Sequence, residues 1–362
     1  MKVLHITTDL PYMRGGKLVN YGGLGMCVLQ LVEGLTDNKI DVDVLTRSEK
    51  DIESEYYRSV VRAPYIALTK SRNWKLTHGI TVLPYFLKLA SKNKYDIIHA
   101  HNPPAAMTVL PAAKYLGFKT VMTMHGPWSK VREKMSSLAD SIERFTLDYA
   151  DVVTFDSNSL CKMYGSKDNY FPIQNAVDPN IFKHSNTDIA RKRFCLDSDK
   201  RVFLYSGRTV FGKNIDTIRA IAGEFPNDVF VVTGWAGNAT DEEFPNIEYL
   251  KSIPNSEMPL LYSACDALIL ASSAEGMSRA VLEAMSCGCA VLLSDIPANS
   301  ETAGKYGRYF KSEEGLKNIL SDLTREEMAA SGIKCRERIV REFGVSKRIE
   351  RFISVYEDLS KR

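Results

Sequence analysis

The stretch ALILASSAEGMSRAVLEAMSCGCAVLLS, from Ala267 to Ser294, decides the fold class. Its apolar runs at Ala267–Ala271 and Ala290–Ser294 have the length and composition of buried strands. Between them, Arg279–Met285 has the composition of a largely buried helix. A strand, a helix and a second strand in so short a span are typical of a parallel sheet, so this stretch predicts an α/β fold.

The same alternation of strand and helix patterns extends along the whole chain. In the first half we predict strands at Val3–Thr7, Val42–Thr46, Ile80–Leu83, Ile97–His101, Thr120–Met124, Val152–Phe155 and Tyr170–Ile173, with helices at Leu24–Leu35, Ala105–Tyr115 and Lys130–Tyr149. In the second half we predict strands at Val202–Ser206, Val229–Thr233, Ile247–Leu250, Ala267–Ala271 and Ala290–Ser294, with helices at Ile215–Ala222, Ser256–Cys265, Arg279–Met285 and Glu313–Leu323. Two Rossmann-like, doubly wound units in tandem follow from this pattern.

The length of 362 residues also favours two domains, because a single hydrophobic core of this size is unusual. Turn-forming residues break the periodicity at Asn175–Lys183. We therefore expect one domain at 1–178 and another at 179–345, with a terminal helix at 346–362 crossing back to the first. Ligands of open α/β sheets bind beyond the carboxyl ends of the strands, so the site is expected in a cleft between the two units.

The composition, 44% hydrophobic and 25% charged, is that of a globular protein. No apolar run reaches the roughly 20 residues of a membrane span, and Met1–Thr7 reads as a strand rather than a signal peptide, so we expect a cytoplasmic protein. The seven cysteines are scattered and odd in number, which favours reduced core residues. A net charge of +3 is too small to indicate nucleic-acid binding.

The positive charge is unevenly distributed, because residues 56–95 contain no Asp or Glu. The basic residues of this stretch are Arg58, Arg62, Lys70, Arg72, Lys75, Lys88, Lys92 and Lys94, with aromatic residues such as Trp74 and Tyr85 among them. Such a surface suits an anionic membrane or an anionic substrate. The alternative is an ordinary solvated face.

Two carboxylates, Glu275 and Glu283, flank the predicted helix start. Gly276, Met277 and Ser278 lie at that start, where free backbone N–H groups and the helix dipole favour an anion such as a diphosphate. Glu283 comes five residues after Ser278, which is about 7 Å along the helix axis at roughly 1.5 Å per residue. This separation suits sugar hydroxyls beside that phosphate. The alternative is a surface Glu275 and a Glu283 that pairs locally. A lone Glu in a buried helix favours the ligand-binding interpretation.

A second group of polar residues follows the strand Val202–Ser206. Gly207 and Arg208 come directly after it, and Lys213 precedes the next helix. Two cations at this end of the strand suit a departing diphosphate, which Arg binds with its fork and Lys as a point charge. Cations at loop tips are common, so these two residues alone do not indicate a binding site. Together with the paired carboxylates they form the best-supported candidate site of the sequence.

Two features of the first half are also candidates for chemistry. Gly22 and Gly23 open a helix without the spacing of a nicotinamide motif, and they indicate either a close approach to a phosphate or a sharp turn. His125 ends a strand beside a glycine, where it can meet a sugar hydroxyl or stabilise charge, or be structural. His99 and His101 end the preceding strand and are weaker candidates. Neither Asp-x-Asp string resembles a metal clamp, so we expect chemistry without a metal or cofactor.

Together these residues resemble the retaining glycosyltransferases of family 4, which have the GT-B architecture. The motifs that carry the resemblance are the early Gly-Gly loop, Thr-x-His-Gly at Thr123–Gly126, Asn-x-Val-Asp at Asn175–Asp178, Gly-Arg-x(4)-Lys at Gly207–Lys213, Glu-x(7)-Glu at Glu275–Glu283, and Glu301. Two departures are Met277-Ser278-Arg279, where relatives carry other residues, and Ala176, where Gly is usual.

The resemblance implies a role for each candidate residue. Arg208 and Lys213 would bind the donor diphosphate, Glu275 the transferred sugar and Glu283 the ribose. His125 would contact the sugar near the reacting carbon, and Gly22 and Gly23 would approach the phosphates. The nucleotide base would meet backbone groups around Lys251–Ile253, so Ile253 is included in the site.

The implied activity is metal-independent transfer of a hexose from a nucleotide-diphosphate sugar to an acceptor hydroxyl, by front-face displacement with retention. The basic stretch adds the expectation of a lipid-linked, glycan or other anionic acceptor and of peripheral membrane attachment. Two alternatives stay open: a sugar-nucleotide epimerase or hydrolase on the same fold, and a non-catalytic sugar-nucleotide-binding subunit.

Overall fold

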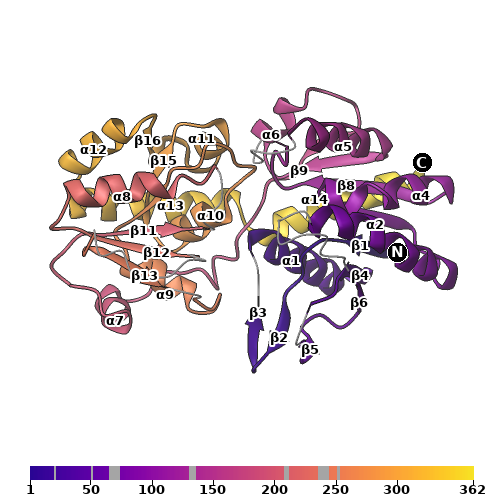
Figure 1. Ribbon diagram of the computed structural model, residues 1–362, viewed down its shortest axis with the longest axis horizontal. Coiled ribbons are helices and arrows are strands. Elements are labelled where there is room, and N and C mark those ends of the chain that lie inside the picture. The colour runs from indigo at the N-terminus through magenta and orange to yellow at the C-terminus, as the bar shows by residue number, and fades with distance from the viewer. Residues whose placement is uncertain are drawn as a thin grey trace. The chain divides into compact units, whose positions relative to one another are not determined.

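The computed structural model describes residues 1–19, 22–49, 52–64, 74–129, 136–207, 212–234, 244–250 and 253–362. The chain forms two compact units (Figure 1). Unit 1 comprises Met1–Asn175 and Val345–Arg362, and unit 2 comprises Ala176–Gly344. Both are parallel sheets with helices on two faces, which confirms the predicted α/β class of two Rossmann-like domains. The cleft expected between them stays a prediction.

The sheet of unit 1 has seven parallel strands in the order β10-β9-β8-β7-β1-β4-β6. These strands are β1 (Lys2–Ile6), β4 (Asp41–Arg47), β6 (Val60–Ala63), β7 (Ile97–His101), β8 (Lys119–Met124), β9 (Val152–Phe155) and β10 (Tyr170–Pro172). A small antiparallel sheet consists of β2 (Tyr12–Arg14), β3 (Lys17–Val19) and β5 (Ser54–Glu55). Strand β1 lies between β4 and β7, so the strand order reverses there and the β1/β7 edge is the switch point of this unit.

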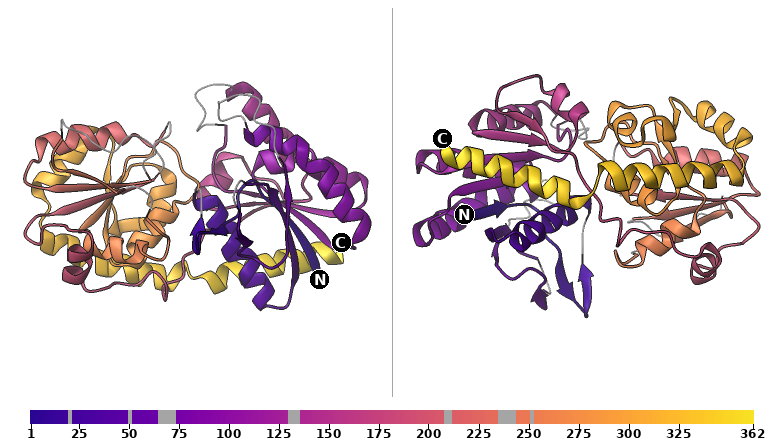
Figure 2. Two further views of the ribbon diagram at one scale, coloured as in Figure 1. Left: turned by 60° about the horizontal axis from the view of Figure 1, so that its bottom comes forward. Right: turned by 180° about the vertical axis from the view of Figure 1, so that it is seen from behind.

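The helices of unit 1 cover both faces of this sheet. They are α1 (Gly23–Asp37), α2 (Trp74–Lys92), α3 (Pro103–Ala106), α4 (Val109–Tyr115), α5 (Ser136–Tyr149), α6 (Asn158–Met163) and α14 (Val345–Lys361). Val3 of β1 packs with α1 and α14 in one apolar cluster, and Leu4 packs with α2 and α4 in another. Figure 2 shows α14, in yellow, running across unit 1. A Cβ on Gly34 of α1 would lie 2.6 Å from Ile349, so glycine allows the two helices to pack closely.

The predicted strand at Ile80–Leu83 is wrong, because these residues lie within α2. A run of four apolar residues is compatible with either a buried strand or one side of a helix. The contacts favour the helix: Val82 and Phe86, one turn apart, are both fully buried, whereas Ile80 is 60% exposed. The parallel strand that adds to β4 is instead β6, in a stretch where the sequence pattern predicted none.

Unit 2 has six parallel strands in the order β13-β12-β11-β14-β15-β16. They are β11 (Val202–Ser206), β12 (Val229–Thr233), β13 (Ile247–Leu250), β14 (Ala267–Leu270), β15 (Ala290–Ser294) and β16 (Arg308–Phe310). The helices are α7 (Thr187–Arg193), α8 (Ile215–Glu224), α9 (Met258–Ala264), α10 (Arg279–Ser286), α11 (Pro297–Ala303), α12 (Glu313–Asp322) and α13 (Arg325–Glu342), with a 3-10 turn, η1, at Gly304–Tyr306. Here the order reverses between β11 and β14, which makes their carboxyl ends the switch point of unit 2.

Successive side chains of β11 alternate between the two cores of unit 2. Val202 and Leu204 face α9, α10 and α13, whereas Phe203 and Tyr205 face α8 and α12. Burial on both faces explains why the strand sequence is continuously apolar. Among the described residues, no helix combines the length and the apolar character needed to cross a membrane.

Candidate functional site

Three backbone contacts shape the loops at the switch point of unit 2. The N–H of Gly207 donates to the carbonyl of Thr233 at 3.2 Å, which ties the end of β11 to β12. The N–H of Ser273, in the loop after β14, donates to the carbonyl of Gly212 at 2.9 Å. The side chain of Asn214 donates to the carbonyl of Ala271 at 2.8 Å. The loop before α8 and the loop before α10 are therefore joined, although about 60 residues separate them.

These joined loops bring Lys213 and Glu275 into a direct ion pair. The Lys213 side chain is 24% exposed and that of Glu275 is 12% exposed, so the pair is shielded but reachable from solvent. An ammonium has three N–H donors, and the pair uses only one of them. Lys213 can therefore hold Glu275 in place and still donate to an anion. Arg208, the other predicted diphosphate-binding cation, lies outside the described residues.

The residues directly before α10 are buried. Gly276, Met277 and Ser278 are all buried, and the Met277 side chain belongs to the apolar core. Ser278 is the N-cap of α10, but its side chain accepts no capping hydrogen bond. The backbone N–H groups of this turn are suited to meet an anion. Ile253 is partly buried against the same core, so its backbone is the part suited to a ligand, and Lys251 lies outside the described residues.

Glu283 lies in α10 with both carboxylate oxygens engaged. The guanidinium of Arg279 donates to Oε1 from Nε at 3.1 Å and from Nη2 at 2.9 Å, and the Tyr262 hydroxyl donates to Oε2 at 3.1 Å. Burial raises the pKa of Glu283, and the contacts with Arg279 and Tyr262 oppose this rise. Sequence reasoning missed both partners. The spacing of Arg279, four residues before Glu283 on one helix, was the available signal.

In unit 1, Gly22 is the N-cap of α1 and Gly23 is its first residue. Gly22 has φ +152° and ψ 179°, a region that residues with a Cβ scarcely occupy. Glycine is therefore required at this helix start for conformational reasons. The geometry is compatible with both interpretations of the Gly-Gly loop, a sharp turn and close approach to a phosphate.

His125 follows β8, and hydrogen bonds to other side chains hold its ring. Nδ1 lies 2.8 Å from Oδ2 of Asp156, and Nε2 lies 3.1 Å from Nδ1 of His101. The backbone N–H of His125 donates to the side chain of Asn102 at 3.1 Å. Burial lowers the pKa of His125, but the charge and hydrogen bond of Asp156 outweigh it and raise this pKa to about 9. The imidazolium form is therefore favoured at neutral pH.

Asp156 is a further residue that sequence reasoning missed. It follows β9, and its position directly after a predicted strand was the available signal. On its other side, Nη2 of the buried Arg348 lies 3.8 Å from Oδ1 of Asp156. Arg348 belongs to α14, so no local pattern near residue 156 indicates it. The engaged ring of His125 has a consequence: a hydrogen bond to a sugar hydroxyl requires the exchange of one partner.

Among the described residues, two groups in unit 1 bring metal-ligating atoms within 4.8 Å of one another. They are His5, His99 and His101, and Cys27, His125 and Asp156. In both groups hydrogen bonds already join members to one another, including those from His5 to His101 and from His125 to Asp156. A metal ion would have to replace these bonds.

Family models match both halves of the chain. The model described as Glycosyltransferase Family 4 matches residues 21–180, and the model described as Glycosyl transferases group 1 matches residues 186–331. The chain is a member of this glycosyltransferase family. It is an enzyme of the GT-B type that uses nucleotide sugars, as expected from its motifs.

Curated relatives are similar along much of their length. An Escherichia coli UDP-Gal:alpha-D-GlcNAc-diphosphoundecaprenol alpha-1,3-galactosyltransferase is 24% identical, over 99% of this chain and 97% of that protein. The Bacillus subtilis protein TuaC, a teichuronic acid biosynthesis glycosyltransferase by its name, is 25% identical over 78% of this chain and 75% of its own.

Solved structures share the fold of this glycosyltransferase. Sucrose-phosphate synthase from Thermosynechococcus elongatus superposes with a TM-score of 0.82 at 19% identity, covering 99% of both chains. Anabaena HepE, solved with UDP-glucose, superposes with a TM-score of 0.76 at 17% identity, covering 99% of this chain and 100% of its own.

Proposed function

We propose that this glycosyltransferase moves a hexose from a UDP-sugar to a hydroxyl of a lipid-linked or other anionic glycan acceptor, with retention of configuration and without a metal ion. The observation that carries the proposal is the Lys213–Glu275 pair, held beside the start of α10 at the switch point of unit 2. Two relatives favour the substrate classes: the name of the E. coli enzyme specifies UDP-Gal and a diphosphoundecaprenol acceptor, and HepE binds UDP-glucose.

Each unit has its own part in this proposal. In unit 2, Lys213 and Arg208 neutralise the diphosphate, while backbone N–H groups at the start of α10 donate to a phosphate oxygen. Glu275 accepts hydrogen bonds from the transferred hexose and Glu283 from the ribose, while the backbone near Ile253 meets the base. In unit 1, the imidazolium of His125 lies near the reacting carbon, and the turn at Gly22 and Gly23 allows close approach to the phosphates.

The reaction follows from these contacts. The acceptor oxygen forms a bond to the anomeric carbon on the face from which the diphosphate oxygen departs, and the carbon–oxygen bond to the diphosphate breaks. The hydroxyl proton passes to the departing phosphate oxygen, so the products are the glycoside and UDP. No covalent carboxylate intermediate is needed, because the cations stabilise the leaving group and the carbon develops oxocarbenium character.

A transfer assay tests the proposal. Purified protein with excess EDTA is incubated with UDP-, GDP- and ADP-hexoses, alone and with a polyprenyl-diphosphate-linked sugar. We expect acceptor-dependent release of UDP and a product whose anomeric configuration by NMR equals that of the donor. Interconversion or hydrolysis without acceptor would instead support an epimerase or hydrolase, and binding without turnover a non-catalytic subunit. An inverted product or an EDTA-sensitive reaction would contradict the proposed mechanism.

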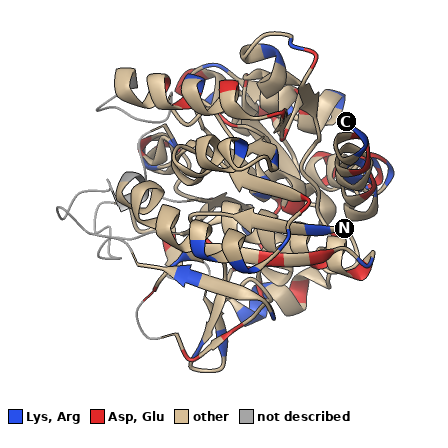
Figure 3. Ribbon diagram, turned by 90° about the vertical axis from the view of Figure 1, so that its right-hand side faces the viewer, with Lys and Arg blue, Asp and Glu red and all other residues tan. Residues whose placement is uncertain are grey.

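We also propose peripheral attachment of unit 1 to the cytoplasmic face of an anionic membrane, where a lipid-linked acceptor resides. Lys88 and Lys92 of α2 are exposed, as are Lys94 just after this helix and Leu87, which is 43% exposed. Arg62, from the same basic stretch, instead pairs with Glu55. Lys70 and Arg72 lie outside the described residues, and the side chain of Lys75 does too. Figure 3 shows ribbon segments that carry Lys or Arg close to segments that carry Asp or Glu around the N-terminal strand of unit 1.

Liposome sedimentation tests the attachment. We expect recovery with anionic vesicles, little recovery with neutral vesicles, and loss on raising the salt concentration, because surface charge is screened. The triple change Lys88→Glu, Lys92→Glu and Lys94→Glu should abolish sedimentation. Equal recovery with both vesicle types, unaffected by salt, would contradict the attachment without affecting the proposed transfer.

A further inference from the structure

One face of the unit 1 sheet is apolar in its first half and polar in its second. On the side covered by α1 and α14, the first halves of the strands contribute Val3, Ile97, Val121 and Val152 to the apolar cluster of that face. Two residues further along each strand come His5, His99, Thr123 and Thr154, and all four are fully buried. Two residues further again come His101, His125 and Asp156. A largely buried band of polar side chains at the carboxyl ends of the strands is costly unless its members satisfy one another.

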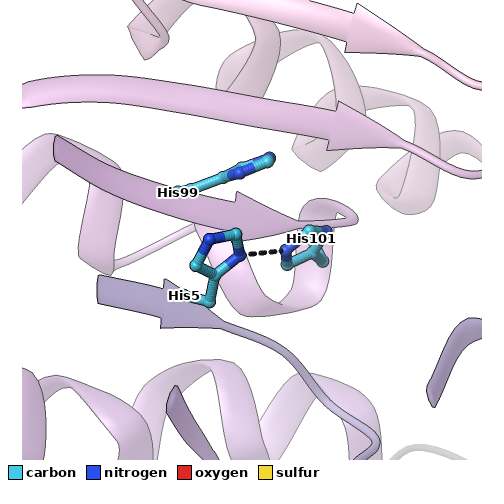
Figure 4. A group of neighbouring side chains, drawn as sticks. All are labelled: His5, His99 and His101. Atoms are coloured by element: carbon cyan, nitrogen blue, oxygen red, sulfur yellow. Dashed lines mark hydrogen bonds between the residues drawn. The ribbon is translucent and has the colours of Figure 1, made fainter. Parts of the chain in front are cut away.

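Hydrogen bonds join this band into one chain that begins at His125. From His125 Nε2 the chain passes to His101, and Nε2 of His101 lies 2.9 Å from Nδ1 of His5. Figure 4 shows His5 reaching from β1 toward His101, with His99 beside it on the neighbouring strand β7. The hydroxyl of Tyr356, from α14, lies 3.5 Å from Nε2 of His5.

The hydrogen-bond chain continues from Tyr356 across the sheet. The Tyr356 hydroxyl lies 2.6 Å from Nδ1 of His99, and Nε2 of His99 lies 2.7 Å from the Thr123 hydroxyl. The Thr123 hydroxyl lies 2.6 Å from that of Thr154, which in turn lies 3.5 Å from the carbonyl of Met122. Each link between His125 and Thr154 joins groups that can either donate or accept.

Two proton orders run without interruption through every link between His125 and Thr154. If His125 is charged, its Nε2 donates to His101, and each following group donates onward as far as the Met122 carbonyl. If His125 is neutral with its proton on Nδ1 toward Asp156, the whole order reverses and His101 donates to His125 Nε2. In both orders His5, His99 and His101 carry one proton each. Their lowered pKa values, caused chiefly by burial, agree with that neutral state.

The groups that face His125 come from several elements. Asp156 follows β9, His101 ends β7, and Cys27 comes from α1, with Asp156 and Cys27 both favouring the charged ring. Arg348 of α14 lies behind Asp156 at 3.8 Å. Asp156 thus contacts Nδ1 of the ring, and His101 contacts Nε2. Because α14 supplies both Arg348 and Tyr356, the last helix of the sequence supports both sides of the His125 ring.

We propose that His101, His5 and Tyr356 are positioning residues that hold the His125 ring in place and set which of its nitrogens carries a proton. This inference rests on the proposed function only in assigning His125 to the reacting sugar. The Nε2 contact to His101 is longer than the charge-assisted contact to Asp156, so it is the one that a sugar hydroxyl exchanges. The chain keeps His125 ordered until that exchange.

The test uses the full chain labelled with ¹⁵N-histidine, with the His125 signals assigned by their loss in His125→Asn. In the wild type we expect both His125 ring nitrogens to be protonated at neutral pH, with a midpoint near 9. His101→Leu removes the acceptor of the charged ring, so the midpoint should fall by about one pH unit. Its kcat should fall about tenfold, with the KM for the donor within twofold. His101→Asn keeps an amide near the position of Nδ1. This variant should restore most of the wild-type midpoint and most of the wild-type kcat.

Tyr356→Phe tests whether the hydrogen-bond chain transmits its effect from Tyr356 to His125. We expect a smaller fall in the His125 midpoint, because the hydroxyl acts through His5 and His101. The matched control is Tyr57→Phe, which also removes a buried hydroxyl from unit 1, one bonded to Thr36 and Val42. This control should lose comparable thermal stability and leave the His125 signals unchanged.

The inference is overturned if folded His101→Leu keeps the wild-type ring signals and midpoint, or if Tyr57→Phe shifts them as much as Tyr356→Phe does. Failure of the proposed function has a different signature. If His125→Asn retains full transfer activity, His125 has no part in the reaction, while the ring signals still report whether the chain orders it.

Discussion

Arg279 clamps Glu283 from one turn earlier in α10, with two donors on a single carboxylate oxygen. Because burial raises the pKa of Glu283 and Arg279 opposes this, Arg279→Met should raise that pKa further. More Glu283 is then protonated at pH 7, and ribose binding weakens. We expect the donor KM to rise about tenfold, the equivalent of one charge-assisted hydrogen bond of about 1.4 kcal/mol, with a smaller change in kcat. Steady-state kinetics from pH 6 to 9 measure this. Arg193→Met, which breaks an exposed pair with Glu257, should change neither value.

Lys213 should matter through its charge at the diphosphate. Lys213→Met is expected to lower kcat/KM by about 10²–10³-fold, the range for removing one stabilising donor from a reaction centre, whereas Lys213→Arg should keep part of the activity. A thermal shift without donor should show a much smaller effect. The control is Lys317→Met, which removes an exposed pair with Glu224 in the same unit. Equal donor affinity and turnover in Lys213→Met and the wild type would refute the assignment of the diphosphate site.

His125 should make the stability of unit 1 decrease in alkali. Its pKa of about 9 in the folded state lies above the ordinary 6.5, so its contribution is fully present below pH 6.5 and is lost as the pH rises through 9. For a pKa shift of this size, the contribution to the free energy of unfolding is at most about 3 kcal/mol. Calorimetry at pH 6, 7.5 and 9 should show the loss in the wild type. Asp156→Asn removes the larger cause of the raised pKa, so this variant should show a smaller loss over the same range.

The three core histidines should make the protein sensitive to acid. The pKa of His5 is lowered to about 3, and those of His99 and His101 lie well below 6.5, chiefly because of burial. Their contribution is present above pH 6.5 and decreases as the pH falls, because only the unfolded chain takes up protons there. Together they contribute up to about 4 kcal/mol per pH unit. Unfolding at pH 6.5, 6.0 and 5.5 measures this slope, and His5→Gln should reduce it by about a third. An unchanged slope would show that His5 is charged in the folded protein.

Gly234 should be irreplaceable at the end of β12. Its φ is +86°, and a Cβ there would lie 2.5 Å from the carbonyl oxygen of Gly207, so Gly234→Ala must displace the turn that leads to Arg208. We expect the free energy of unfolding to fall by about 2–4 kcal/mol, because left-handed strain adds to the backbone clash. Donor binding should weaken as well. Gly288→Ala is the matched control. Gly288 has φ +76°, but a Cβ there would make only an ordinary contact at 3.9 Å. The Gly288→Ala variant should therefore lose about 1–2 kcal/mol of unfolding free energy and keep its donor affinity.

Sequence patterns were sufficient wherever the signal is local. The strand-helix-strand alternation fixed the α/β class, and the spacing of Glu275 and Glu283 placed them around the start of α10. A short apolar run was not sufficient at Ile80–Leu83, because strand and helix both bury such a run and only its neighbours decide between them.

The sequence by itself determined the two parallel sheets, the family motifs and which residue types stand at the strand ends. Only the tertiary structure decided how those residues pair. Lys213 meets Glu275 across 62 positions, and Asp156 meets His125 across 31. Tyr356 reaches His99 across 257. The physical reason is that a parallel sheet gathers the ends of distant strands at one edge, whereas the periodicity of a strand or helix reports only which face a residue occupies.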